Sequence, residues 1–267
     1  MKNTIHDLER VLDMKIVDIN SKNISQYPAV CFLNPKNEGY LKKLEWLKGR
    51  FYEGLKIKQL YLENERKCNG FIEYISGENA WRAVKAEGYL FIHCIWITPN
   101  KYKEQGYGSQ LVEECIRDVF EQGKCGVAVI TSEGPFMAGK NLFLKNGFHS
   151  VAHAEPSFEL MVKKTKECPD PEFNDWKKEL SKYNGLNIIY SLQCPWVARS
   201  ISEFKEIAAE KGLKLKLIEI KSAREAQSAP SIYAAFNLIY NGKLLSDHYI
   251  SSRRFLSIIK KELPKKD

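Results

Sequence analysis

The chain has 267 residues, which is long for a single domain and about right for two. Apolar residues make up 44% and charged residues 28% of the chain, a balance that excludes disordered, collagenous and coiled-coil classes. The formal charge is +8, and charged residues interrupt the N-terminal stretch. We therefore expect no signal peptide, no membrane span and no membrane partner, which predicts a cytoplasmic protein.

The positive charge is concentrated in the last third of the chain. Residues 186–267 hold 14 Lys or Arg and 8 Asp or Glu, a net charge of +6. A recognised nucleic-acid motif and interleaved aromatic residues are both missing there. The charge is therefore more typical of a solvated surface, and we expect no nucleic-acid partner.

Seven cysteines occur, at positions 31, 68, 94, 115, 125, 168 and 194. Their number is odd and no CxxC pair is present, which predicts neither a structural zinc site nor a disulfide framework. Most of them are expected to be small apolar core residues, as Cys115 is on an apolar helical stripe. Cys194 has a different setting, described below.

Strands and helices alternate through the first part of the chain. The expected elements, in order, are strands at 71–76 and 89–98, a helix at 110–122, a strand at 127–131, a short helix at 140–145 and a strand at 157–162. The polar stretch that follows contains Pro169 and Pro171, which predicts a connector because proline disfavours helix in the preceding residue.

The last part of the chain repeats the alternation on a smaller scale. We expect a strand at 186–191, a helix at 195–211, strands at 213–220, 231–240 and 244–250, and a closing helix at 253–262. Asn241-Gly242 between the last two strands is a strong hairpin signal. The predicted organisation is a domain at 1–165, a linker at 166–185 and a smaller domain at 186–267, in an α/β (α+β) fold class.

The segment from Ile95 to Ser109 is the most informative part of the sequence. A strand ends at Pro99, a basic polar turn follows, and Gly106 and Gly108 stand at the start of a helix. Glycine lets a backbone approach a ligand closely, and the first turn of a helix presents free N–H groups and a positive dipole end. Together they predict an anion site suited to a pyrophosphate. The alternative is a simple turn with two glycines, because a bare GxG pattern is common.

Three pieces of this sequence resemble the GNAT family of N-acetyltransferases. The run Lys103-Glu104-Gln105-Gly106-Tyr107-Gly108 is similar to the family's coenzyme A loop, with Lys in the place of Arg or Gln. The preceding strand ends in the family's pattern of hydrophobic residues before a proline, at 95–99. The run 141–148, which ends in Asn-Gly-Phe, is similar to the family's closing helix and its Gly-Phe signature.

The resemblance implies a mixed-sheet acetyltransferase domain that uses acetyl-CoA as co-substrate. The strand from Tyr89 would splay from the strand at Val127, with the pantetheine in the gap. Backbone groups of Ile95 and Ile97 would pair with it, and an N–H near Trp96 would help to stabilise the oxyanion. The backbone N–H groups that would hold the pyrophosphate belong to Glu104, Gln105, Gly106, Tyr107, Gly108 and Ser109.

Two positions depart from the family pattern. Phe143 stands where many members carry a tyrosine that reprotonates the leaving thiolate, and Phe136 where many carry an asparagine. Either another acid or water serves, or the chemistry is slow or absent. The candidate catalytic bases are Glu133 and His93; the alternatives are a surface turn residue and a core histidine.

Cys194 precedes Pro195 at the expected start of a helix. A cysteine at this N-cap would have a lowered pKa and react as a thiolate. The order of elements over 186–262 resembles a thioredoxin-like fold, which implies a cis Pro230 facing the cysteine. The redox pair is reduced to Cys194-x-x-Val197, which leaves a monothiol role or a binding and dimerisation role. The combination with an acetyltransferase domain resembles the YoaP-like acetyltransferases of bacteria.

The leading function is an N-acetyltransferase that acts on the amine of a small-molecule or peptide acceptor. The first alternative is a catalytically silent acyl-CoA-binding module whose thioredoxin-like tail binds a thiol compound or a protein partner. The second is a monothiol oxidoreductase at Cys194. No metal site is expected, and homodimerisation is left open.

Overall fold

The computed structural model describes residues 14–264 apart from 28–30, 32–33, 64 and 66. It divides into two compact units that interleave along the chain. Among the described residues, the first unit consists of those in 14–27, 50–77 and 86–170, and the second of those in 31–49, 78–85 and 171–264. Residues 31–49 and 78–85 therefore lie with the C-terminal part, whereas the sequence indicated two contiguous domains.

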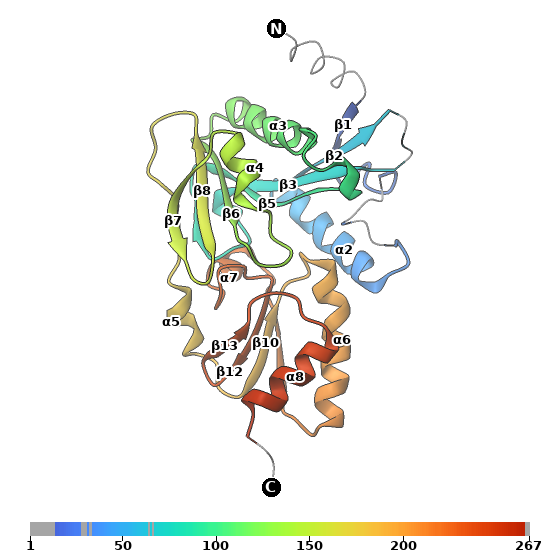
Figure 1. Ribbon diagram of the computed structural model, residues 1–267, viewed down its shortest axis with the longest axis vertical. Coiled ribbons are helices and arrows are strands. Elements are labelled where there is room, and N and C mark those ends of the chain that lie inside the picture. The colour runs from blue at the N-terminus through green and yellow to red at the C-terminus, as the bar shows by residue number, and fades with distance from the viewer. Residues whose placement is uncertain (1–13, 28–30, 32–33, 64, 66, 265–267) are drawn as a thin grey trace. The chain divides into compact units, whose positions relative to one another are not determined.

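The first unit is built on a seven-stranded sheet in the order β1-β2-β3-β5-β6-β8-β7 (Figure 1). Neighbouring strands are antiparallel except β5 and β6, which are parallel and joined by a helical crossover. The strands are β1 (Met14–Ile19), β2 (Lys56–Leu62), β3 (Gly70–Ser76), β5 (Tyr89–Ile97), β6 (Gly126–Thr131), β7 (His149–Ala154) and β8 (Phe158–Lys164). The two main helices are α3 (Tyr107–Glu121) and α4 (Lys140–Lys145).

Helix α3 forms the crossover because one of its faces is continuously apolar. Leu111, Val112, Cys115 and Val119 are fully buried and pack on the sheet with the other members of one core. The helix begins three residues earlier than the sequence predicted. Near its end, Gly123 has a φ of 61°, a left-handed conformation that is favourable for glycine and typical of helix ends.

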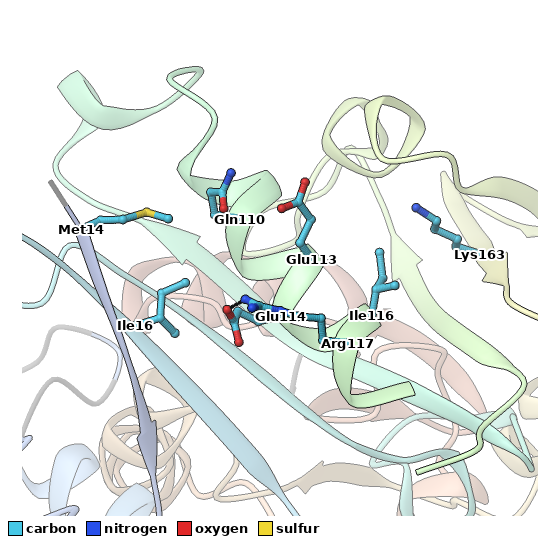
Figure 2. Close-up of a pocket in the computed structure, with 8 residues that line it drawn as sticks. All are labelled: Met14, Ile16, Gln110, Glu113, Glu114, Ile116, Arg117 and Lys163. Atoms are coloured by element: carbon cyan, nitrogen blue, oxygen red, sulfur yellow. Dashed lines mark ion pairs between the residues drawn. The ribbon is translucent and has the colours of Figure 1, made fainter. Parts of the chain in front are cut away.

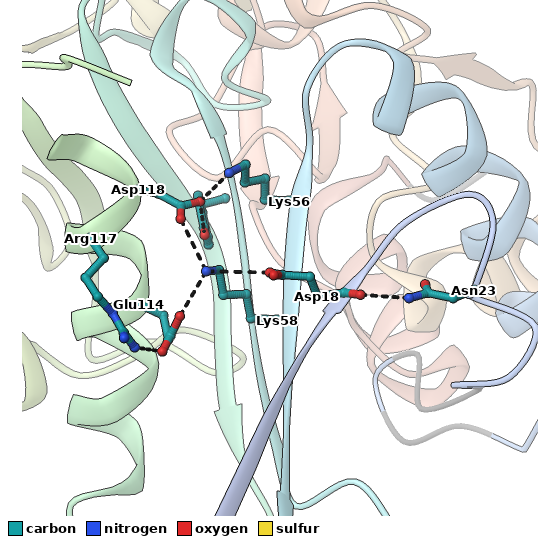
Figure 3. A network of polar contacts seen from close by, with 8 residues as sticks. Asp18, Asn23, Lys56, Lys58, Glu114, Arg117 and Asp118 are labelled. Carbon is teal, nitrogen blue, oxygen red and sulfur yellow. Dashed lines mark hydrogen bonds and ion pairs between the residues drawn. The ribbon is translucent and has the colours of Figure 1, made fainter. Parts of the chain in front are cut away.

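A buried polar network joins β2 to α3 (Figure 3). The Lys58 side chain is only 8% exposed, and its Nζ lies 2.9 Å from Glu114 and 3.2 Å from Asp118. Asp118 also accepts hydrogen bonds of 2.6 Å from Lys56 and from the Tyr74 hydroxyl. Burial raises the pKa of Asp118, but these hydrogen bonds and the lysine charges outweigh it and leave the pKa below its usual value.

One disulfide joins Cys125 to Cys168, whereas the odd cysteine count without a CxxC pair predicted no disulfide framework. The two residues are 43 positions apart, and their spacing gives no sign of the pairing. Gly126 pairs with Lys164, so the start of β6 lies beside the end of β8. Cys125 directly precedes β6 and Cys168 follows β8, which brings the two cysteines together.

The second unit has a four-stranded sheet in the order β11-β10-β12-β13. Its strands are β10 (Leu186–Tyr190), β11 (Leu215–Glu219), β12 (Phe236–Tyr240) and β13 (Lys243–Ser246); β10 is parallel to β11 and antiparallel to β12. Helices α6 (Pro195–Glu210) and α8 (Ser252–Glu262) contribute Val197, Phe204 and Phe255 to its core. The strand expected at 231–240 begins only at Phe236, because residues 231–235 form mostly bends.

Short elements complete this unit. Strand β4 (Val84–Lys85) pairs with β9 (Glu172–Phe173), and α5 (Trp176–Leu180) follows, so the expected linker is partly structured. Helix α7 (Ala223–Gln227) precedes β12, and most of α2 (Glu38–Tyr52) also belongs here. Across the described ranges, no helix has both the length and the apolar character needed to cross a bilayer.

Candidate active site

Strands β5 and β6 separate partway along their length. Their pairing runs from Tyr89 with Gly126 to Ile92 with Val129 and ends there. Beyond this point Ile95, Trp96 and Ile97 pair only with β3, while the end of β6 pairs only with β8. A gap therefore opens between two parallel strands at their C-terminal ends, where ligands commonly bind in such sheets.

The loop that leaves β5 leads directly to the start of α3. Gly106 is the N-cap with a φ of 92°, and a Cβ atom added there would meet nothing within 4 Å. The first helical hydrogen bond runs from the Gln110 N–H to the Gly106 carbonyl, and the first turn contains no acidic residue. The backbone N–H groups at this helix start are thus suited to an anion.

Polar and aromatic contacts hold the loop in place. The Tyr102 hydroxyl donates to Glu65 at 2.5 Å, and this bond together with Lys101 keeps the pKa of Glu65 below its usual value. The Gln105 side chain donates to the Lys101 carbonyl. The Lys103 ammonium group lies 5.2 Å from the Trp96 ring centre, so a positive charge lies beside the exposed end of β5.

Two loop residues have their side chains engaged elsewhere in the first unit. The Ser109 hydroxyl accepts a hydrogen bond of 3.0 Å from Asn146, at the C-terminal end of α4. A Cβ added at Gly108 would lie 3.1 Å from Leu142 of α4, so this glycine allows close packing of α3 on α4. Gly106 and not Gly108 is therefore the glycine with open space beside it.

The two departures from the family pattern have different surroundings. Phe143 is fully buried on α4 and packs edge-to-face on Phe148, with ring centres 5.3 Å apart. Phe136 is 44% exposed in the loop before α4, with a φ of 66°. Neither side chain has a proton to donate.

The candidate base Glu133 lies in the loop after β6, where it lines a cavity of about 640 Å³. Its backbone N–H donates to the Ser157 hydroxyl at 3.2 Å, and its side chain is exposed. Other lining residues come from the start of α4 and from the β7–β8 hairpin. The sequence did not reveal this cavity, because β7 carries no clear alternation of apolar residues and was not predicted.

The candidate base His93 lies on β5 at an irregularity in its pairing with β3. Cys94 pairs with Glu73 and Ile92 with Tyr74, so His93 is the extra residue of a bulge. Its ring is fully buried, and Nδ1 lies 3.5 Å from the Glu73 carboxylate. Bulges often redirect a side chain next to an active site, which leaves both the catalytic and the core interpretation of His93 in place.

Cys194 is the N-cap of α6, as the sequence predicted, but the expected lowering of its pKa is not found. Burial raises the pKa of the thiol, and neither the N–H groups of Val197 and Trp196 nor the nearby positive charges offset it. The expectation of a cis Pro230 was also wrong. The cis peptide bonds in the described ranges precede Pro99 and Pro156.

A second cavity of about 640 Å³ lies along the outer side of α3 (Figure 2). Apolar side chains of Met14, Ile16 and Ile116 line it together with charged groups, among which Glu114 and Arg117 form an ion pair. None of its lining residues belongs to β5 or β6. It is therefore separate from the gap between those strands.

The sequence of the chain is similar to those of two known protein families. Residues 22–148 match the acetyltransferase (GNAT) family, and residues 214–256 match the YoaP-like family. The Bacillus subtilis (strain 168) protein named "Uncharacterized N-acetyltransferase YoaP" is 29% identical over 252 residues, which cover 92% of this chain and 98% of that protein.

Solved structures that resemble the chain are more distant in sequence. A GNAT-family acetyltransferase from Staphylococcus aureus Mu50 is 15% identical with a TM-score of 0.42, and the match covers 57% of this chain and 99% of that one. The PaiA N-acetyltransferase of Thermoplasma acidophilum, solved with coenzyme A, is 13% identical with a TM-score of 0.37, over 57% and 99% of the two chains.

The chain is thus similar to GNAT acetyltransferases over its first part and to YoaP-like proteins over its last part. It is an enzyme, an N-acyltransferase of the GNAT type, and its co-substrate is acetyl-CoA, the acetyl donor of that family. The start of α3 is compatible with the phosphates of that donor, because it offers backbone N–H groups, open space at Gly106 and a first turn without an acidic residue.

Proposed function

We propose that the protein transfers the acetyl group of acetyl-CoA to the amine of a small-molecule or peptide acceptor. The observation that carries this proposal is the gap between β5 and β6, which opens at the same end of β5 from which the chain passes into the start of α3. The gap leaves one edge of β5 free to pair with an extended ligand, and the helix start attracts an anion. These are the two features that a pantetheine with an attached pyrophosphate requires.

Each part of the proposed donor site has a distinct role. The backbone groups of Ile95 and Ile97 pair with the pantetheine, and an N–H near Trp96 stabilises the oxyanion. The N–H groups from Glu104 to Ser109 hold the pyrophosphate, and Lys103 adds a positive charge beside them. Donors aimed at developing negative charge commonly contribute several kcal/mol to catalysis.

The proposed reaction is a direct attack of a neutral amine on the thioester carbonyl carbon. A C–N bond forms, the C–S bond breaks, and the amine loses one proton to Glu133 or His93, directly or through water. The departing thiolate takes a proton from water in this scheme, because Phe143 occupies the position of the usual acid and has none to give. The reaction therefore depends more on solvent than it does in members that carry a tyrosine.

A charge reversal at Lys103 tests the donor site. Lys103→Glu places a carboxylate beside the pyrophosphate site and should weaken coenzyme A binding at least tenfold in calorimetry. Lys261→Glu is the matched control, because that side chain is 82% exposed on α8 in the other unit. Equal affinity of the wild type and Lys103→Glu for coenzyme A would show that the donor site lies elsewhere. Gly108→Glu is less informative, since it also disturbs the contact with Leu142.

Release of free coenzyme A thiol across a panel of amines tests the reaction itself. Amine-dependent release with one acetylated product per thiol supports the transferase. Tight binding of acetyl-CoA without release for any amine would favour the silent acyl-CoA-binding module instead. The raised pKa of Cys194 gives the monothiol oxidoreductase less support, because the thiolate is the reactive form.

For the second unit we propose a thioredoxin-like accessory domain in the region 186–267. The parallel pair β10 and β11, the antiparallel strands β12 and β13, and the flanking helices α6 and α8 support this proposal. The trans bond before Pro230 and the single Cys194 depart from a redox-active member. We therefore propose that the domain binds a thiol compound or a protein partner and does not cycle between dithiol and disulfide.

A further inference from the structure

The cavity of about 640 Å³ at the end of β6 has the size of a small-molecule site, for which 300–1,000 Å³ is typical. Three parts of the first unit form its walls: the residues that follow β6, the start of α4 and the β7–β8 hairpin. Strands β7 and β8 form one edge of the sheet in Figure 1, and β8 is the strand that pairs with β6. The cavity begins at Thr131, two residues after Val129, the last residue of β6 that pairs with β5.

Hydroxyl groups fix the shape of this cavity. The Ser132 and Ser157 hydroxyls lie 2.8 Å apart, and Ser157 also accepts the Glu133 N–H. The Gly134 N–H donates to Ser132 at 3.0 Å, which closes the turn after β6. The loop that carries Glu133 is thereby held against the hairpin, while the Glu133 side chain stays exposed to the cavity.

The charges around the cavity do not cancel. The Lys140 ammonium group lies 2.7 Å from the Glu159 carboxylate, and the hydrogen-bonded pair lowers the pKa of Glu159 and raises that of Lys140. This pair is neutral as a unit. The other two carboxylates in the lining belong to Glu133 and Glu155, so the lining holds three acidic side chains and one lysine. Such a site favours a cation and disfavours an anion.

We propose that this cavity holds the acceptor, and that the acceptor is a diamine, whose second amino group stays protonated. The inference rests on the proposed acetyl transfer, and it adds the class of substrate. Glu133, next to the gap between β5 and β6, receives the proton of the reacting amine. Glu155, in the turn between β7 and β8, pairs with the distal ammonium group and sets the preference for a doubly basic acceptor.

Direct binding separates this inference from the proposed reaction. Calorimetry of the full chain in the presence of coenzyme A compares 1,4-diaminobutane with butylamine, which has the same carbon chain and one charge fewer. The diamine should bind about five- to tenfold more tightly, as expected for one added charge pair near a protein surface. The difference should shrink in 0.5 M salt because exposed charges are screened.

Variants of the lining residues give effects of opposite sign. Glu155→Gln should remove the preference for the diamine and leave butylamine binding unchanged. Lys140→Gln frees the Glu159 carboxylate and should strengthen diamine binding severalfold, which a merely structural effect would not do. Glu121→Gln, at the end of α3 and outside the cavity, is the matched control.

Two outcomes overturn the inference whatever the transfer assay shows. One is equal affinity of the wild type for the two amines. The other is a diamine preference that survives in Glu155→Gln. Conversely, a Glu155-dependent preference for the diamine without any release of coenzyme A would keep the cavity as a cation site and contradict the proposed acetyl transfer.

Discussion

Partial burial and the dipole of α6 act on the pKa of the Cys194 thiol in opposite directions. The sequence placed this residue at the N-cap of α6 correctly, and that position alone favours the thiolate. Whether burial or the dipole determines the pKa cannot be predicted from the sequence, because burial of the thiol depends on residues far away along the chain. The structure shows that burial prevails and raises the pKa of the thiol.

We expect alkylation of Cys194 by iodoacetamide to be slow at neutral pH and to accelerate with rising pH. Only the thiolate reacts, so the rate should increase about tenfold per pH unit until the raised pKa is reached, above the value of about 8.5 for a free cysteine. Peptide mapping after timed alkylation measures the rate, with Cys194→Ser as the control that identifies the peptide. A rate that levels off below pH 8 would show that the dipole prevails.

At the scale of elements, charged residues hide strands from sequence patterns. Strand β2 contains the buried Lys58, which interrupts its apolar pattern, and this strand was not predicted. Its neighbours on α3 neutralise the lysine, so a charge that looks solvated in the sequence is part of the interior. Strong patterns were predicted well: α4 has the expected limits, and β3, β5 and β6 differ from theirs by a residue.

We expect Asp118→Asn to destabilise the first unit by about 3 kcal/mol, the lower end of the range for breaking a buried ion pair. Lys58 keeps Glu114 as a partner, which limits the loss. Urea unfolding measures the change. Asp170→Asn is the control, because its pair with Lys164 is half exposed and should contribute no more than about 1 kcal/mol.

The same substitution defines a pH dependence. The pKa of Asp118 is lower in the folded protein than its ordinary value of 3.8, so the folded state binds this proton less readily than the unfolded state. Its contribution is complete above that ordinary value and is lost as pH falls through the lower folded pKa. The stability difference between wild type and Asp118→Asn should therefore be constant near neutral pH and diminish below about pH 4.

The disulfide between Cys125 and Cys168 should also stabilise the folded protein. It closes a stretch of 43 residues, and the loop-entropy relation gives about 4 kcal/mol for that length. The double variant Cys125→Ser, Cys168→Ser should lower the urea midpoint accordingly, and dithiothreitol should lower the midpoint of the wild type but not of the variant. Equal midpoints for oxidised and reduced wild type would show that the bond contributes nothing to folding.

At the scale of the whole molecule, the sequence indicated the two kinds of unit but not which residues build each one. The glycine loop at 106–108 and the order of elements predicted the acetyltransferase domain. Proline and polarity around residue 170 predicted a junction between two contiguous domains, which stays a prediction. The contributions of residues 31–49 and 78–85 to the second unit could not be predicted, because they depend on contacts between segments far apart in the sequence.

These inserted segments are an integral part of the second unit. Trp46 and Trp81 are buried and pack edge-to-face with ring centres 5.0 Å apart. The Asn174 N–H donates to the Ala83 carbonyl, and β4 pairs with β9. The Gln227 side chain donates to the Glu78 carbonyl at 3.0 Å. A C-terminal fragment therefore lacks partners that its own residues use.

We expect a fragment of residues 171–267 to be less stable than the same residues in the full chain. Loss of the 78–85 segment leaves β9 without its partner strand. It also removes the acceptors of the hydrogen bonds from Asn174 and Gln227, each of which contributes about 1 kcal/mol. Apolar surface that the segment normally covers becomes exposed. Amide hydrogen exchange compares β10 and β12 in the two contexts, and faster exchange in the fragment is the expected result. Equal protection would show that the region 186–267 folds on its own, as the polar, proline-containing stretch before it first indicated.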